Sequence, residues 1–91
     1  MPELRLLPSF KRALRRVAGR DRRLAERIEL ALVRFQADIH HPGLNFEKVT
    51  HRDYCTIRAT VGLRIALRSS GPDTFDVIDI GGHDEIYRRN G

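Results

Sequence analysis

The chain has 91 residues, of which 41% are hydrophobic and 32% are charged. This length and composition fit one globular domain over residues 1–91 and exclude a disordered tail. No apolar run approaches the roughly 18 residues that a membrane span needs, and the first residues lack the charged and apolar segments of a signal peptide. A single cysteine cannot form an internal disulfide and favours a reducing compartment. We therefore expect a cytoplasmic protein.

Positive charge is concentrated in the first part of the chain. Residues 1–36 carry ten Lys or Arg against four Asp or Glu, a net charge of +6, whereas residues 37–91 carry seven against eight, a net charge of −1. All basic residues except Lys11 and Lys48 are arginines, whose planar guanidinium suits phosphate and carboxylate. The pattern favours RNA or an acidic protein as a partner, although a solvated helix face without a function can carry the same charges.

The first elements predicted along the chain are a strand and two helices. Residues 3–7 alternate weakly between polar and apolar side chains and stop before a proline, which is typical of a short strand. Ser9 and Asp21 are candidate N-caps, and Gly19 ends the first helix. Each helix has one apolar stripe at helical spacing: Phe10, Ala13, Leu14, Val17 and Ala18 in the first, and Leu24, Ile28, Ala31, Leu32 and Phe35 in the second. These stripes predict an antiparallel helical hairpin that packs on the core.

A loop and three strands are expected after the helices. Residues 38–53 form the loop, in which Leu44 and Phe46 are expected to anchor the backbone to the core. The strand candidates are 54–59, 63–69 and 74–81. Their connections have the length of hairpin loops, so the strands should pair antiparallel. The order β-α-α-β-β-β predicts an α+β fold in which the helical hairpin packs on one face of an antiparallel sheet.

Alternation along the second and third strands sorts their side chains into two faces. The apolar set belongs under the helices and consists of Cys55, Ile57, Ala59, Leu63, Ile65 and Leu67. Cys55 is interpreted as a small buried hydrophobic residue. The opposite face, expected to be uncovered, carries Tyr54, Thr56, Arg58, Arg64 and Arg68.

The last strand brings further functional groups to the rim of the sheet. It ends at two glycines, which let the backbone turn sharply, and His83 and Tyr87 follow. Histidine can act as a base or an acid near neutral pH, arginine can bind phosphate, and tyrosine can stack on unpaired bases. The combination predicts an RNA site that needs no cofactor and no metal, since the histidines lack ligand spacing.

A structural interpretation of the same residues remains open. Strand arginines on a free face can serve only solubility. His83 can terminate the strand through a backbone hydrogen bond, and Tyr87 can cover the edge of the core. Asp84 and Glu85 count against phosphate binding and fit a surface turn or partners for arginine.

Short motifs in a fixed order resemble the RelE/ParE superfamily of toxins from toxin–antitoxin systems, over nearly the whole chain. They are a proline-led helical hairpin, Tyr54-x-x-Ile57-Arg58, Gly62-x-Arg64, and Gly81-x-His83 followed by Tyr87-Arg88. The resemblance implies the RelE-like fold, an antitoxin as the protein partner, and no cofactor.

In RelE-type members that cleave mRNA on the ribosome, basic strand residues and a C-terminal His and Tyr act on the RNA. Carried over by position, this implies catalytic roles for Arg58, Arg64, His83 and Tyr87, with RNA binding by Tyr54, Thr56, Arg68 and Arg88. Thr56 stands where RelE has a lysine, and Asp84 adds a negative charge beside His83. The implied function is a ribosome-dependent mRNA endoribonuclease that inhibits translation, with ribosome and mRNA as partners. The alternatives are a ParE-type inhibitor of DNA gyrase that does not cleave RNA, and a non-toxic binding module.

Overall fold

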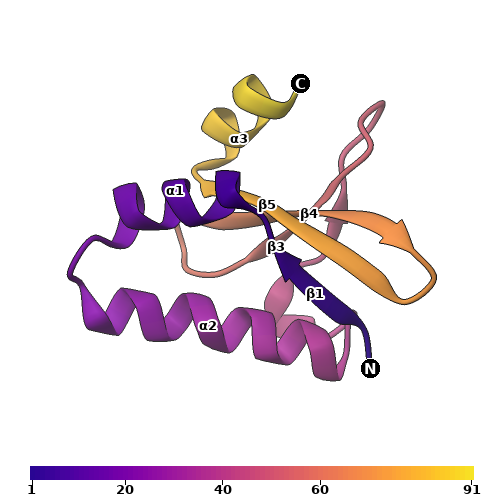
Figure 1. Ribbon diagram of the computed structural model, residues 1–91, viewed down its shortest axis with the longest axis horizontal. Helices are drawn as coiled ribbons and strands as arrows, with labels where there is room; N and C mark the ends of the chain where they lie inside the picture. The colour runs from indigo at the N-terminus through magenta and orange to yellow at the C-terminus, as the bar shows by residue number, and fades with distance from the viewer.

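The strands of the computed structural model, which describes residues 1–91, form a five-stranded sheet in the order β1-β5-β4-β3-β2 (Figure 1). The elements are β1 (Glu3–Leu6), α1 (Pro8–Ala18), α2 (Arg22–Ala37), a 3-10 turn η1 (Pro42–Leu44), β2 (Glu47–Lys48), β3 (Cys55–Arg58), β4 (Arg64–Gly71), β5 (Thr74–Gly81) and α3 (His83–Asn90). The predicted α+β fold is confirmed.

Three features of the sheet and its helices go beyond the predicted order. The short edge strand β2 pairs with β3, and a third helix, α3, follows the last strand. The first strand pairs with the last one, and this pair is parallel, whereas the other pairs are antiparallel. The sheet is therefore mostly antiparallel. None of the helices combines the length and the apolar character required to cross a membrane.

The helix caps confirm one prediction and correct another. The Asp21 side chain caps α2 by accepting a hydrogen bond from the Leu24 N–H at 3.1 Å, as predicted. Ser9 does not cap α1, because the helix already begins at Pro8, which suits a first helical position. The Ser9 hydroxyl instead donates a hydrogen bond of 2.7 Å to the carbonyl of Ile78, so it fastens α1 to β5.

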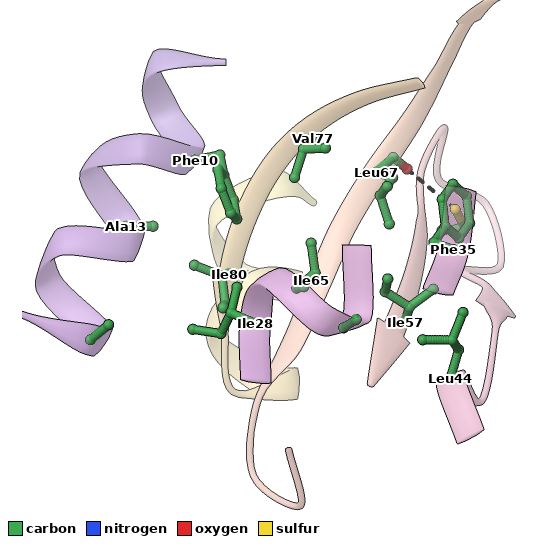
Figure 2. Packing of buried hydrophobic residues seen from close by; sticks show 13 residues of the cluster. Phe10, Ala13, Ile28, Phe35, Leu44, Ile57, Ile65, Leu67, Val77 and Ile80 are labelled. Atoms are coloured by element: carbon green, nitrogen blue, oxygen red, sulfur yellow. Dashed lines mark hydrogen bonds between the residues drawn. The ribbon is translucent and has the colours of Figure 1, made fainter. Parts of the chain in front are cut away.

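The main core lies between the helical hairpin and one face of the sheet. The two predicted helix stripes contribute to it, either fully buried or packed against its edge. From the sheet, Ile57, Ile65 and Leu67 are completely buried, and Figure 2 shows them pointing towards Ile28 and Phe35 of α2. The predicted inward face of β3 and β4 is therefore confirmed.

The predicted roles of Cys55, Leu44 and Phe46 are also confirmed. The Cys55 thiol is buried, donates to the Leu67 carbonyl, and burial raises its pKa to about 11. This hydrogen bond is the dashed line in Figure 2. Leu44 is buried and Phe46 stacks on Phe35 with ring centroids 6.4 Å apart, so both anchor the loop after α2 to the core.

The opposite face of the sheet is not uncovered, and this expectation was wrong. Helix α3 packs on it, and Ile86 forms a second small core with Tyr54, Ala66 and Ile78. Figure 1 shows α3 and α2 on opposite sides of the strands. The physical reason is Ile86 itself, since this apolar side chain is removed from water only if α3 lies on the sheet.

Candidate functional site

Helix α3 is fastened to the sheet through a buried carboxylate on β5. Asp79 is 5% exposed and accepts two hydrogen bonds from Arg89, at 2.9 and 3.1 Å, and one of 2.8 Å from Asn90. The side chain of Glu85 caps the helix by accepting from the Gly82 N–H at 3.0 Å, and it also lies 3.6 Å from Arg89. The Asp79 contacts hold the last turn of α3, and the cap holds the first turn, which begins at His83 directly after β5.

Arg64 is held in place by groups on three segments. Its Nε donates to the Thr56 hydroxyl at 2.9 Å, and its Nη2 donates to the carbonyls of Asn45 at 2.6 Å and Thr56 at 3.3 Å. The Glu47 carboxylate lies 3.5 Å from the same Nη2. Both N–H groups of Nη1 make no hydrogen bond, so a fixed guanidinium keeps free donors for an anion.

Arg58 and Arg64 stand directly opposite each other on the β3–β4 ladder. Like charges at such a position are destabilising. Burial lowers the pKa of Arg64, the Glu47 carboxylate opposes this change, and repulsion from Arg58 adds to it. Arg58 is exposed and forms no ion pair. The two cations therefore create a place where a phosphate would relieve the repulsion.

A hollow of about 240 Å³ brings the C-terminal residues next to the strands. Glu47, Thr56, His83 and Tyr87 are among its lining residues. Thr56, Arg64, His83 and Tyr87 also line one narrow crevice under α3. The hollow thus combines a carboxylate, an imidazole and a phenol beside the fixed guanidinium of Arg64, which are groups that can transfer protons and bind phosphate.

Tyr87 is half-exposed and lies under a further cation. The guanidinium carbon of Arg52 sits 4.8 Å from the centre of the Tyr87 ring, a cation–π contact. Tyr87 belongs to neither hydrophobic cluster, although it lines the crevice beside Tyr54 and Ile86 of the second one. Tyr87 lines the hollow, and the Arg52 guanidinium lies over its ring.

The four residues predicted to bind RNA have different surroundings. Tyr54 and Thr56 are each 4% exposed. The Tyr54 ring cannot stack on a base, because Ile86 covers it, and burial raises the pKa of its hydroxyl. Thr56 serves as the acceptor that positions Arg64. Arg68 lies near the other end of β4, 3.0 Å from Asp53 but not aligned for a hydrogen bond, and Arg88 is exposed on α3 without an ion pair.

Sequence reasoning missed Glu47 and Arg52 as members of this region. Glu47 pairs with Thr56 through the two-residue strand β2, which is too short to show a periodic signal. Arg52 reaches Tyr87 from the loop before β3. A detectable signal existed only for α3, whose first turn carries Asp84 and Glu85 and whose last turn carries Arg88 and Arg89, the charges that a helix dipole favours.

No group of three or more His, Cys, Asp or Glu side chains is arranged to hold a metal ion. The chemistry that the arrangement supports is proton transfer by Glu47 and His83 next to phosphate binding by arginine.

Comparisons with known proteins agree with the fold. No protein-family model matches the sequence, and no curated protein does. Solved structures match over nearly their full length. A YoeB/ParE toxin from Agrobacterium tumefaciens has a TM-score of 0.72 at 21% identity, covering 89% of this chain and 98% of its own. A chain from the RelB–RelE antitoxin–toxin complex of Methanococcus jannaschii has a TM-score of 0.70 at 21% identity, covering 96% of this chain and 99% of its own.

A chain from the DinJ–YafQ complex of E. coli aligns with a TM-score of 0.68 at 8% identity, covering 96% of this chain and 99% of its own. Sequence identities this low establish a shared fold only. The chemistry of this chain must be inferred from its own site residues. The chain therefore has the fold of the RelE/ParE superfamily of toxins, as its ordered motifs predicted.

Proposed function

We propose that this protein is the toxin of a toxin–antitoxin pair and that it inhibits translation by cleaving mRNA on the ribosome. The observation that carries the proposal is the hollow beside β2, β3 and α3. There Glu47, His83 and Tyr87 lie next to Arg64, which Thr56 and Asn45 hold with free donors. The fold, shared with toxins, supports the proposal independently.

The cleavage uses the 2′-hydroxyl of the RNA as nucleophile. Its oxygen attacks the neighbouring phosphorus and loses its proton to the Glu47 carboxylate, while the bond to the 5′-oxygen breaks. Protonated His83 gives its proton to that leaving oxygen, so the products are a 2′,3′-cyclic phosphate and a 5′-hydroxyl end. Arg58 and the free Nη1 of Arg64 stabilise the negative charge that grows on the phosphate. Tyr87 supports a base by stacking.

Dependence on the ribosome follows from the openness of this site. The side chain of Glu47 is 58% exposed and Tyr87 is 45% exposed, so few side chains fix the position of a flexible RNA. Cleavage requires the attacking oxygen, the phosphorus and the leaving oxygen to be nearly in line, and positioning contributes much of the rate. A ribosome that holds the message supplies this orientation, so naked RNA is cut slowly.

An antitoxin is the expected protein partner. Two of the similar solved structures are complexes with RelB and DinJ. The excess of positive charge on this chain favours an acidic antitoxin, since charge complementarity speeds association.

The test is a translating extract to which the purified protein is added, with mRNA ends mapped by primer extension. New ends should appear at the ribosome. His83→Ala, Arg64→Ala and Glu47→Gln should each slow cleavage by about 10² to 10⁴-fold, because each removes a proton-transfer group or a phosphate donor. Arg15→Ala, a matched change on an exposed helix arginine, should cleave like the native protein. Tyr87→Phe should have a small effect if the ring only stacks.

Intact message at equal amounts of protein and ribosome would exclude the endonuclease. A supercoiling assay with DNA gyrase then separates the remaining classes, because a ParE-type toxin blocks supercoiling and a non-toxic binding module does not.

A further inference from the structure

A cavity of about 580 Å³ opens between the loop that follows α2 and three strands of the sheet. Ile39 and Phe46 of the loop, Cys55 of β3, Leu67 of β4 and Phe75 of β5 are among its lining residues. The cavity is more than twice as large as the hollow of the proposed RNA site, and volumes of this size are typical of small-molecule sites. The proposed cleavage makes no use of it.

The cavity has aromatic walls. Phe46 and Phe75 both pack on the buried Phe35, with ring centroids 6.4 and 5.0 Å from its own. Both are only partly buried, so each keeps ring surface beside the cavity. The buried side chains of Leu67 and Cys55 also border it. Because aromatic rings pair favourably with further rings, these walls favour an aromatic ligand over an aliphatic one.

Lys48 supplies positive charge at this cavity. It is exposed, borders the cavity and forms no ion pair. Burial raises the pKa of the Cys55 thiol to about 11, and the Lys48 ammonium opposes this rise. The charge of Lys48 therefore acts on the apolar wall and favours an anionic group inside the cavity.

The Asp and the Arg that border the cavity already have partners. Asp53 lies 3.0 Å from Arg68, so its carboxylate is matched by a cation. The Arg52 guanidinium lies over the Tyr87 ring. Lys48 is thus the cation that remains for a ligand.

We propose that this cavity binds a small aromatic carboxylate. The ring of the ligand lies against Phe46 and Phe75, and its carboxylate pairs with Lys48. An RNA strand fits less well, because each nucleotide carries a phosphate whereas Lys48 alone remains to pair with one. The proposal rests on the chemistry of the cavity and does not depend on the proposed function.

The test titrates naphthoate into the whole protein and follows the backbone amide signals by NMR. Binding should saturate with a dissociation constant of about 1 mM or below, as expected for a ligand of this size. The signals of Ile39 and Ser69, which border this cavity and not the RNA hollow, should shift. Naphthamide, which has the same rings without the charge, and cyclohexanecarboxylate, which has the charge without an aromatic ring, are the comparison ligands. Each should bind about three- to fivefold more weakly than naphthoate.

Lys48→Gln should weaken naphthoate binding by about three- to fivefold and leave naphthamide binding unchanged, because only the carboxylate pairs with the ammonium. Lys11→Gln is the matched control. Lys11 is the other lysine of the chain, is exposed on α1 and forms no ion pair. Its replacement should change the affinity for naphthoate by less than about 1.5-fold.

Ser69→Trp should fill the cavity. Ser69 is exposed, shares a strand face with Leu67 and stands opposite Phe75 on the β4–β5 ladder. The indole should weaken the binding of naphthoate and naphthamide by at least about tenfold, because it takes the place of their rings. Phe75→Leu keeps an apolar wall without the aromatic ring. It should weaken naphthoate by about threefold and leave cyclohexanecarboxylate unchanged, and it tests the same wall if the tryptophan variant does not fold.

The proposal would be overturned if naphthoate showed no saturation up to about 10 mM. Equal losses for Lys48→Gln and Lys11→Gln would also overturn it, since they would indicate unspecific attraction. So would shifts confined to His83 and Tyr87, which would place the ligand in the RNA hollow. None of these measurements uses RNA or ribosomes. A protein that cuts message but does not bind naphthoate therefore refutes only the cavity proposal.

Discussion

The arginines of the helical hairpin and those of the sheet surface under α3 differ in whether they form ion pairs. No basic side chain between Lys11 and Arg34 forms an ion pair, whereas Arg64, Arg68 and Arg89 each lie within 4.0 Å of a carboxylate. Burial explains the pairs of Arg64 and Arg89, in which the Arg64 side chain and the Asp79 carboxylate are largely buried, whereas the Arg68–Asp53 pair lies at the surface. Cations on the hairpin stand in water, where pairing gains little, while the buried Asp79 requires a partner.

The difference separates two uses of charge. Unpaired cations on the hairpin add to the long-range field that attracts anionic partners, at a small cost in self-repulsion. Paired arginines determine where α3 and the end of β4 lie, so they set the shape of the hollow. Substitutions in the first region should change association, and substitutions in the second should change stability and geometry.

The largest effect on stability is expected for Arg89→Ala. It leaves the Asp79 carboxylate buried with Asn90 as its remaining side-chain donor, and α3 loses its main attachment to β5. We expect a loss of about 2 to 3 kcal/mol in the free energy of unfolding, measured by urea denaturation, with less helix by circular dichroism. Arg88→Ala, an exposed neighbour without an ion pair, is the control and should stay within about 0.5 kcal/mol. Equal stabilities for the two variants would contradict the assigned role of Asp79.

Arg64→Ala and Arg58→Ala should differ although the two residues face each other. Arg64 makes three hydrogen bonds that join β4 to β3 and to the turn at Asn45. Its loss should cost about 1 to 2 kcal/mol of unfolding free energy. Removing Arg58 breaks no ion pair and relieves the repulsion of like charges. The stability of that variant should be unchanged or slightly higher, while its RNA cleavage still falls. A large loss of stability in Arg58→Ala would show that the residue has a structural contact.

The sequence predicted those parts of the fold that periodicity controls. Alternation placed Ile57, Ile65 and Leu67 under the helices because successive strand side chains must point to opposite faces. Helical spacing likewise identified the stripes that contain Phe10 and Phe35.

Helix α3 could not be found in this way, because its eight residues include a single buried apolar side chain, Ile86. Its stability comes from contacts with distant residues such as Asp79, and short helices depend on such tertiary contacts. Missing α3 produced the error about Tyr54 and Thr56, and missing the two-residue strand β2 concealed Glu47. The charges at both ends of α3 were the available signal.

Substitution of hairpin arginines should leave the unfolding free energy almost unchanged and weaken RNA binding, unlike substitution of Arg89. Replacing Arg12 and Arg16 with glutamine removes two exposed cations that have no carboxylate partner. The unfolding free energy should change by less than about 0.5 kcal/mol. Binding of a single-stranded RNA should weaken, and its dependence on salt should become shallower by up to about one unit of slope for each arginine that pairs with a phosphate. A fluorescence titration at several salt concentrations measures this slope. An unchanged slope would mean that these cations do not touch the backbone of the nucleic acid.

The smallest expected effect concerns the cap of α3. The Gly82 N–H donates to the Glu85 carboxylate and is the main reason that the pKa of Glu85 lies below its usual value of 4.5, with Arg89 adding to the shift. A carboxyl group with a lowered pKa in the folded state stabilises the protein above the pKa of the unfolded chain, and this stabilisation is lost as pH falls through the folded value. Carbon-13 NMR should therefore show Glu85 titrating at lower pH in the protein than in a short peptide of residues 81–91.

Gly82→Pro sharpens the test, because φ at Gly82 is −68°, which proline also adopts, and proline has no N–H. The midpoint should rise towards the peptide value but stay below it, since Arg89 remains. If the midpoint does not move, the helix start is held by the Arg89 contacts with Asp79 alone, and the C-terminal arginines dominate both the attachment and the capping of α3.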